Sequence, residues 1–102
     1  MDRTLPMQYQ GPSSSVARTL QFPWATTVSS VTSVKAWKDG TDVSSTTLSG
    51  SNTATGNTIA LKTLGALIGG EVYILEVVAV VDGVTDTWWL PVTCLKAATG
   101  KT

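Results

Sequence analysis

Apolar and polar residues alternate with a period of two along much of this chain. In the segment 15–22 every second residue is apolar except Arg18, and Pro23 follows directly. This period predicts a β-strand rather than a helix. Because Arg18 interrupts the apolar face, we expect this strand to lie near an edge or end of a sheet.

The segment 72–81 is the most apolar part of the chain and also alternates. One face consists of Tyr73, Leu75, Val77, Ala79 and Val81, and the other of Val72, Ile74, Glu76, Val78 and Val80. A strand of a sandwich normally buries only one face against the opposite sheet. The second apolar face of this central strand therefore needs cover, either from an opposing sheet or from a neighbouring subunit.

Further strands and turns follow from the same pattern. We expect strands at 28–38, 53–62 and 84–95, a short polar strand at 42–49, and a glycine-rich crossing at 64–70 with room for one helical turn. Asp39-Gly40 and Asp82-Gly83 are strong signals for hairpin turns, and Gly56-Asn57 predicts a bulge or a tight turn.

Together these elements predict an all-β fold, an Ig-like antiparallel β-sandwich of about seven strands with an extended N-terminal arm. A small closed barrel is the competing architecture. Residues 1–14 show no period and form the arm, residues 15–97 the sandwich, and residues 98–102 a polar tail. An arm of this kind is ordered only where it docks, on its own domain or on a neighbour.

The composition excludes several classes of function. Seven basic and seven acidic residues leave no positive field to recruit nucleic acid or an anionic membrane surface. The chain has no histidine, and its single cysteine, Cys94, excludes an intrachain disulfide and a multi-cysteine zinc site. We therefore expect no enzyme activity, metal, cofactor or small-molecule substrate.

The chain also lacks the pattern of a membrane or secretory segment. Its longest uncharged apolar run, 77–81, is far too short to cross a bilayer as a helix, and no apolar core follows the first charged residues. We expect a soluble product that is made in a cytosol.

Trp88 and Trp89 are neighbours in a predicted strand, so their side chains point to opposite faces. Alternation with Leu90 and Cys94 places Trp88 in the core and Trp89 on the outside. The outer indole is either covered by the arm or a loop, or it anchors a partner. Pro91 cannot donate a ladder hydrogen bond, which predicts a local edge or a bulge at this point.

Three further groups of residues raise the question of chemistry. Asp39 and Asp42 flank a glycine, which is far more typical of a hairpin turn than of a calcium loop. Glu76 is best interpreted as a solvated or ion-paired residue within an apolar strand rather than a catalytic acid. Cys94 alternates with core residues, and no histidine is present to activate it as a nucleophile.

A characteristic order of segments appears along the chain. A Pro-Ser stretch at 11–15 precedes Phe22-Pro23-Trp24 and the strand that ends in Val34-Lys35-Ala36-Trp37, and later Gly70-Glu71-Val72-Tyr73 enters the penultimate strand. This order resembles the small Ig-like virion proteins of tailed bacteriophages, of the fibre–tail adaptor or head decoration type. The last three predicted strands also resemble those of Ig-like and fibronectin-like modules, in which the hydroxyl of this tyrosine pins the preceding loop.

The resemblance implies a non-enzymatic structural protein that is made in the host cytoplasm and resides in the virion. It would form a homo-oligomer and pack against capsid, neck, tail or fibre proteins, with the arm 1–14 laid over an adjacent subunit. Near-zero net charge suits dense packing of identical copies. We expect the protein interface to contain Trp89, Val78, Val80, Ile74, Tyr9 and Met7.

A second hypothesis comes from a different class of function. The chain would instead be a carbohydrate- or receptor-binding adhesion module. Such a module needs an exposed aromatic platform with polar side chains nearby, and Trp24 and Trp89 are the candidates.

Overall fold

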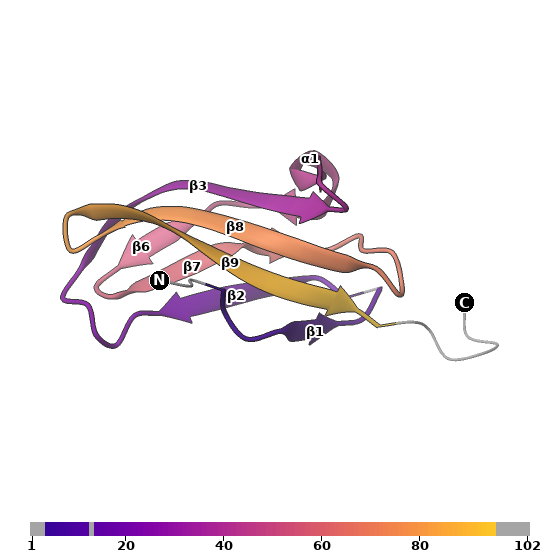
Figure 1. The fold of residues 1–102 in the computed structure, drawn as a ribbon, viewed down its shortest axis with the longest axis horizontal. Coiled ribbons are helices and arrows are strands. Elements are labelled where there is room, and N and C mark those ends of the chain that lie inside the picture. Colours follow the sequence, from indigo (N-terminus) through magenta and orange to yellow (C-terminus); the bar gives the residue numbers. More distant parts are fainter. Residues whose placement is uncertain (1–3, 13, 96–102) are drawn as a thin grey trace.

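The computed structural model describes residues 4–12 and 14–95, which form a mostly β structure (Figure 1). The all-β prediction is confirmed at this level, and the predicted tail 98–102 lies outside the described residues. Within the described part of the chain the elements are β1 (Gln8–Gln10), β2 (Val16–Gln21), β3 (Val28–Lys38), β4 (Thr41–Asp42), α1 (Ser44–Thr47), β5 (Leu48–Ser49), β6 (Thr53–Thr55), β7 (Thr58–Leu64), β8 (Val72–Val81) and β9 (Val84–Cys94).

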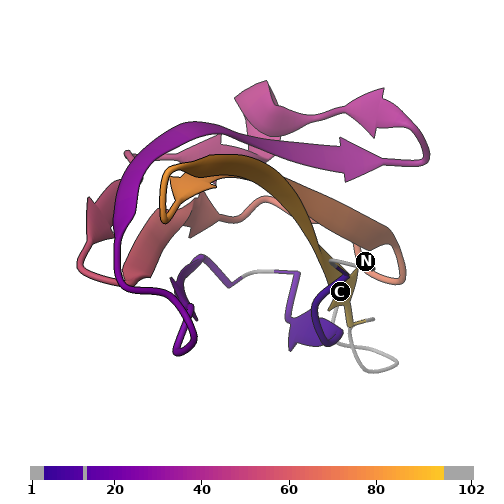
Figure 2. The same cartoon turned by 60° about the vertical axis from the view of Figure 1, so that its left-hand side comes forward.

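The strands pair into two sheets, which the turned view in Figure 2 shows as separate layers. One sheet has the strand order β1-β9-β8-β3-β4, and the other has the order β2-β7-β5, with β6 also pairing with β7. The core between them is a single cluster of buried side chains, among them Ile59, Leu64, Leu75 and Val92. Arg18 lies on β2, at an edge of its sheet, as its place in the apolar pattern predicted.

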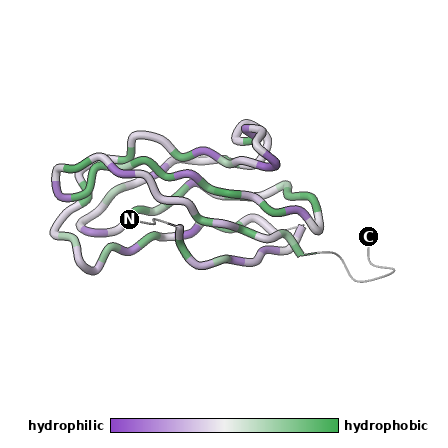
Figure 3. The backbone as a smooth tube through the Cα atoms, viewed as in Figure 1, coloured by the Kyte–Doolittle hydropathy of each residue, from purple (hydrophilic) through white to green (hydrophobic). Residues whose placement is uncertain are grey.

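The longest strands form where the alternation is strongest. β3 and β8 occupy the predicted segments, and β9 ends one residue earlier than expected. In β8 every second residue, from Tyr73 to Val81, is buried, while the residues between them are exposed or half-buried. The hydrophobic colouring in Figure 3 follows β8 along much of its length. β-branched side chains suit such a pleated, half-buried surface.

Two hairpin turns have the predicted positions. Asp39 and Gly40 connect β3 to β4, and Asp82 and Gly83 connect β8 to β9. All four residues have φ between 49° and 81°. Positive φ at both central residues characterises the type I′ turn, whose twist matches that of paired strands.

The segment 42–49 differs from its prediction as one polar strand. Two short strands flank the single helical turn α1, in which the hydroxyls of Thr46 and Thr47 both donate to the carbonyl oxygen of Val43. The Asp42 carboxylate accepts hydrogen bonds from the backbone N–H and the hydroxyl of Ser44. Short polar side chains that bond to nearby backbone compete with a strand ladder, and here they close a turn.

The N-terminal segment packs on its own sheet. β1 runs parallel to β9, and the backbone N–H of Leu5 donates to the carbonyl oxygen of Trp89 at 2.7 Å. Residues 4–10 therefore dock on their own domain, which is one of the two alternatives for the arm, and contact with an adjacent subunit stays a prediction. The parallel pair also makes the five-stranded sheet mixed rather than purely antiparallel. Without β1, the backbone N–H and C=O groups on one side of β9 would lack strand partners.

Pro91 lies where the N-terminal segment loses register with β9. Thr4 pairs with Trp89, and Gln8 pairs with Val92. The N-terminal segment therefore advances four residues while β9 advances three. The pairing of β9 with β8 continues through Pro91 without a shift. The β8–β9 ladder therefore carries no bulge at Pro91, and the extra residue lies in the N-terminal segment rather than in β9.

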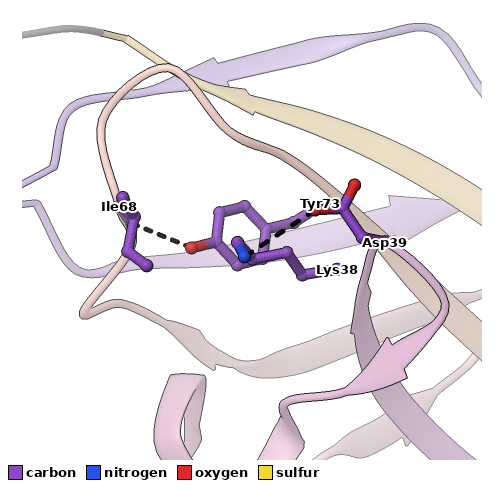
Figure 4. A network of polar contacts seen from close by, with 4 residues as sticks. All are labelled: Lys38, Asp39, Ile68 and Tyr73. Carbon is purple, nitrogen blue, oxygen red and sulfur yellow. Dashed lines mark hydrogen bonds and ion pairs between the residues drawn. The ribbon is translucent and has the colours of Figure 1, made fainter.

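The glycine-rich segment between β7 and β8 crosses from one sheet to the other without a helical turn. At the start of β8, Tyr73 is buried, and its hydroxyl accepts a hydrogen bond of 2.8 Å from the backbone N–H of Ile68 (Figure 4). This is the contact between a tyrosine and its preceding loop that the sequence resemblance implied. Beside it, the Lys38 ammonium lies 3.8 Å from the Asp39 carboxylate.

Candidate interaction face

The side of the five-stranded sheet that faces away from the core carries an unusual share of apolar side chains. We call it the outer face. From β8 it receives the alternate residues Val72, Ile74, Glu76, Val78 and Val80. Ile74 is 40% exposed, while Val78 and Val80 are half-buried. The opposite sheet covers the other side of β8 and leaves this side without cover from it.

β9 adds an aromatic residue and a proline beside these positions. Glu76 pairs with Trp89, and Ile74 pairs with Pro91. Trp88 is buried in the core, whereas Trp89 is 39% exposed, so the predicted division of the two indoles is confirmed. The N-terminal segment holds the backbone of Trp89 and leaves much of its side chain open to solvent.

The N-terminal segment extends the outer face beyond β9. Tyr9 pairs with Thr93 and is 64% exposed, while its neighbour Gln10 is buried. The thioether sulfur of Met7 accepts a hydrogen bond of 3.0 Å from the Thr93 hydroxyl. All six residues that the sequence singled out, on three separate segments, thus lie on one face of one sheet.

β3 contributes one residue to this face that the sequence analysis did not include among the interface residues. Trp37 pairs with Ile74 across the β3–β8 ladder and is half-buried. Its indole N–H is buried and has no hydrogen-bond partner among residues 4–12 and 14–95. The signal was available, because Trp37 alternates in phase with Lys35 and out of phase with the buried residues Val34 and Ala36.

One row across the middle of the outer face carries two charged side chains, Lys35 and Glu76. Lys35, Glu76 and Trp89 are in register across three strands. Lys35 is exposed and Glu76 half-buried. Charged side chains within an apolar sheet face disfavour nonspecific association with other sheets. A partner that binds this face must present complementary charges.

The remaining candidates for chemistry occupy structural positions. Burial raises the pKa of the Cys94 thiol, which keeps it in the unreactive protonated form. The hydroxyl and backbone N–H of Ser44 hold the pKa of Asp42 below its ordinary value. Among residues 4–12 and 14–95 there is no cluster of three His, Cys, Asp or Glu side chains that could hold a metal ion. No helix of that part of the chain is both long enough and apolar enough to span a membrane.

A groove lies on another part of the surface, between the open edges of the two sheets. Its volume is about 340 Å³. It is lined by Leu5, Pro6, Gln8, Thr19, Leu20, Gln21, Phe22, Trp24, Trp88 and Leu90. Trp24 is the most exposed of the four tryptophans, at 63%. No pattern in the sequence predicted a groove beside Trp24.

The chain matches no family model, no curated protein and no solved structure.

Proposed function

We propose that this protein is a non-enzymatic structural component of a bacteriophage particle that assembles through its outer face. The observation that carries the proposal is the convergence of Met7, Tyr9, Ile74 and Trp89 on one exposed sheet surface. Contiguous exposed apolar surface on a small domain marks an interaction site, because water contact makes it costly to leave uncovered. Aromatic residues and methionine are the side chains most enriched at the centre of protein interfaces.

We further propose that the sandwich is Ig-like. Support comes from the pairing of the first strand with the last and from the bond between the Tyr73 hydroxyl and the loop that precedes it. The partner would be a second copy of this chain, other virion proteins, or both. Near-zero net charge favours association of identical copies, since their mutual repulsion is small.

Sedimentation equilibrium of the whole chain over a wide concentration range tests the interface. We expect concentration-dependent self-association, which Trp89→Ala and Ile74→Ser each weaken by about tenfold or more. Trp24→Ala is the matched control, because it removes an indole that is even more exposed than that of Trp89 and lies outside the outer face. A protein that stays monomeric at every concentration, or whose Trp89→Ala variant associates equally well, contradicts self-association through this face.

The phage assignment has a separate test. We expect the genes on either side of this one to encode capsid, portal, tail or fibre proteins. A flanking region made only of metabolic genes would argue against a virion protein without affecting the proposed interface.

A further inference from the structure

The groove between the open sheet edges has features of a small-molecule site that the outer face lacks. On one side lie Leu5, Pro6 and Gln8 of the N-terminal segment, and on the other the end of β2. The buried side chains of Trp88 and Leu90 form its apolar base. A concave site with an apolar floor, a few polar side chains and a volume of this order is typical of ligand pockets, which range over about 300–1,000 Å³.

The exposed indole at this groove is held in place. Trp24 meets Phe22 edge to face, with ring centroids 5.8 Å apart and planes at 82°. Phe22 is itself buried and packs on Trp88 at 5.0 Å. A chain of three rings therefore connects Trp24 to the core. A fixed aromatic surface loses little conformational entropy when a ligand stacks on it.

The polar part of the lining is neutral. Gln8, Thr19 and Gln21 are exposed, and none of the lining residues carries a charge. The side chains of Gln8 and Gln21 make no hydrogen bond to any other described residue. Amides and a hydroxyl offer both donors and acceptors, which match a ligand of many uncharged hydroxyl groups. Phosphates, carboxylates and amines would instead require an opposite charge to offset their desolvation.

We propose that this groove binds a neutral hexose unit of an oligosaccharide. The apolar C–H face of the sugar ring stacks on the indole of Trp24, while its hydroxyl groups exchange hydrogen bonds with Gln8 and Gln21. The indole supplies an apolar surface that the C–H face of a pyranose ring can cover. The side-chain amides replace the hydrogen bonds to water that the sugar hydroxyls lose on binding. This site is separate from the outer face and does not depend on the proposed assembly.

Isothermal titration calorimetry of the whole chain tests the site with three neutral probes: maltohexaose, cellohexaose and fully N-acetylated chitohexaose. We expect at least one to bind, and Trp24→Ala to weaken its binding by about tenfold or more. Gln21→Ala should weaken it by a smaller factor, because it removes one hydrogen-bonding group. Trp89→Ala is the matched control and should leave the affinity within about twofold of the original. Far-ultraviolet circular dichroism verifies that each variant is folded.

Several results would overturn this site. No measurable heat with any of the three oligosaccharides is one, and unchanged binding by the Trp24→Ala variant is another. Tighter binding of an anionic oligogalacturonate or of a proline-rich peptide would assign the groove to a different ligand class. The assembly proposal is tested by sedimentation of the Trp89→Ala variant, and the sugar site by calorimetry of the Trp24→Ala variant. Failure of one proposal can therefore be distinguished from failure of the other.

Discussion

The side-chain amide of Gln10 donates a hydrogen bond of 2.6 Å to the backbone carbonyl oxygen of Leu64. Gln10 belongs to β1 of the five-stranded sheet, and Leu64 ends β7 of the other sheet, so one side chain bridges the two layers. The same amide donates to the carbonyl oxygen of Ser14, and its oxygen accepts from the guanidinium of Arg18. A buried glutamine with all these partners fixes the N-terminal segment against the second sheet.

Gln10→Ala should lower the free energy of unfolding by about 2–3 kcal/mol. The loss arises because the carbonyl oxygen of Leu64 stays buried without its donor and the guanidinium of Arg18 loses its acceptor. Urea denaturation followed by tryptophan fluorescence measures it. Gln8→Ala, on the same strand but exposed, should change stability by no more than about 0.5 kcal/mol. Equal effects of the two substitutions would show that Gln10 does not hold the sheets together.

The Asp82 carboxylate ties the β8–β9 turn to the loop before β3. It accepts hydrogen bonds from the backbone N–H groups of Thr26 and Thr27, the shortest at 2.9 Å. We expect Asp82→Ala to destabilise the protein by about 1–2 kcal/mol more than Asp39→Ala. Both aspartates have φ near 50°, a backbone conformation that is unfavourable for alanine. This contribution to the free energy of unfolding is therefore similar in the two variants and cancels in their difference.

Thermal unfolding of the two variants measures this difference. The Asp39 carboxylate is exposed and forms an ion pair with the ammonium of the adjacent Lys38, and such an exposed pair contributes little to stability. A larger loss for Asp39→Ala than for Asp82→Ala would contradict the role assigned to Asp82.

Tyr73→Phe removes one hydroxyl from a buried ring. The backbone N–H of Ile68 then loses its acceptor, and we expect a loss of about 1–1.5 kcal/mol in the free energy of unfolding. Native-state hydrogen exchange should show faster exchange of the Ile68 amide than in the original protein. Tyr9→Phe, at an exposed tyrosine, is the control and should leave both quantities unchanged. An unaltered Ile68 exchange rate in the Tyr73 variant would mean that this bond does not hold the loop.

The carboxyl group of Asp42 should titrate below the ordinary aspartate pKa, because the hydroxyl and then the backbone N–H of Ser44 stabilise its charged form. A group whose pKa is lower in the folded state stabilises the fold above its ordinary pKa, and this contribution disappears as the pH falls through the lowered value. Carbon-detected NMR titration measures the pKa. Ser44→Ala should move it back towards the ordinary value, since the hydroxyl is the larger cause. A pKa at or above the ordinary value in the original protein would be the contrary result.

The long strands were predictable because their cause is local. In β3, β8 and β9 the alternation of side chains determines which residues face the core, and a neighbouring strand changes only the pairing partner. The turn at Asp82 was predictable for the same reason, since a backbone with positive φ favours Asp and Gly in sequence. The prediction of a strand at 42–49 was wrong because the side chains of Asp42, Thr46 and Thr47 form local hydrogen bonds. Those bonds decide between a polar strand and a turn.

The two candidate surfaces, the outer face and the groove, also differ in how far the sequence predicted them. Period two placed Ile74 and Trp89 away from the core within their own strands, but it could not say that these strands are neighbours in register. The groove beside Trp24 was beyond prediction, because its lining comes from the N-terminal segment, β2 and β9, whose approach depends on how two sheet edges meet.

By itself the sequence determined the strand segments, their buried faces and the neutral character of the surface, because each depends on side chains near one another in the chain. Only the tertiary structure decided that Gln10 bridges the sheets, that the N-terminal segment packs on its own chain, and that six separate residues share one face. Those relationships rest on contacts between residues far apart in sequence, and their energies exist only once the two layers have packed.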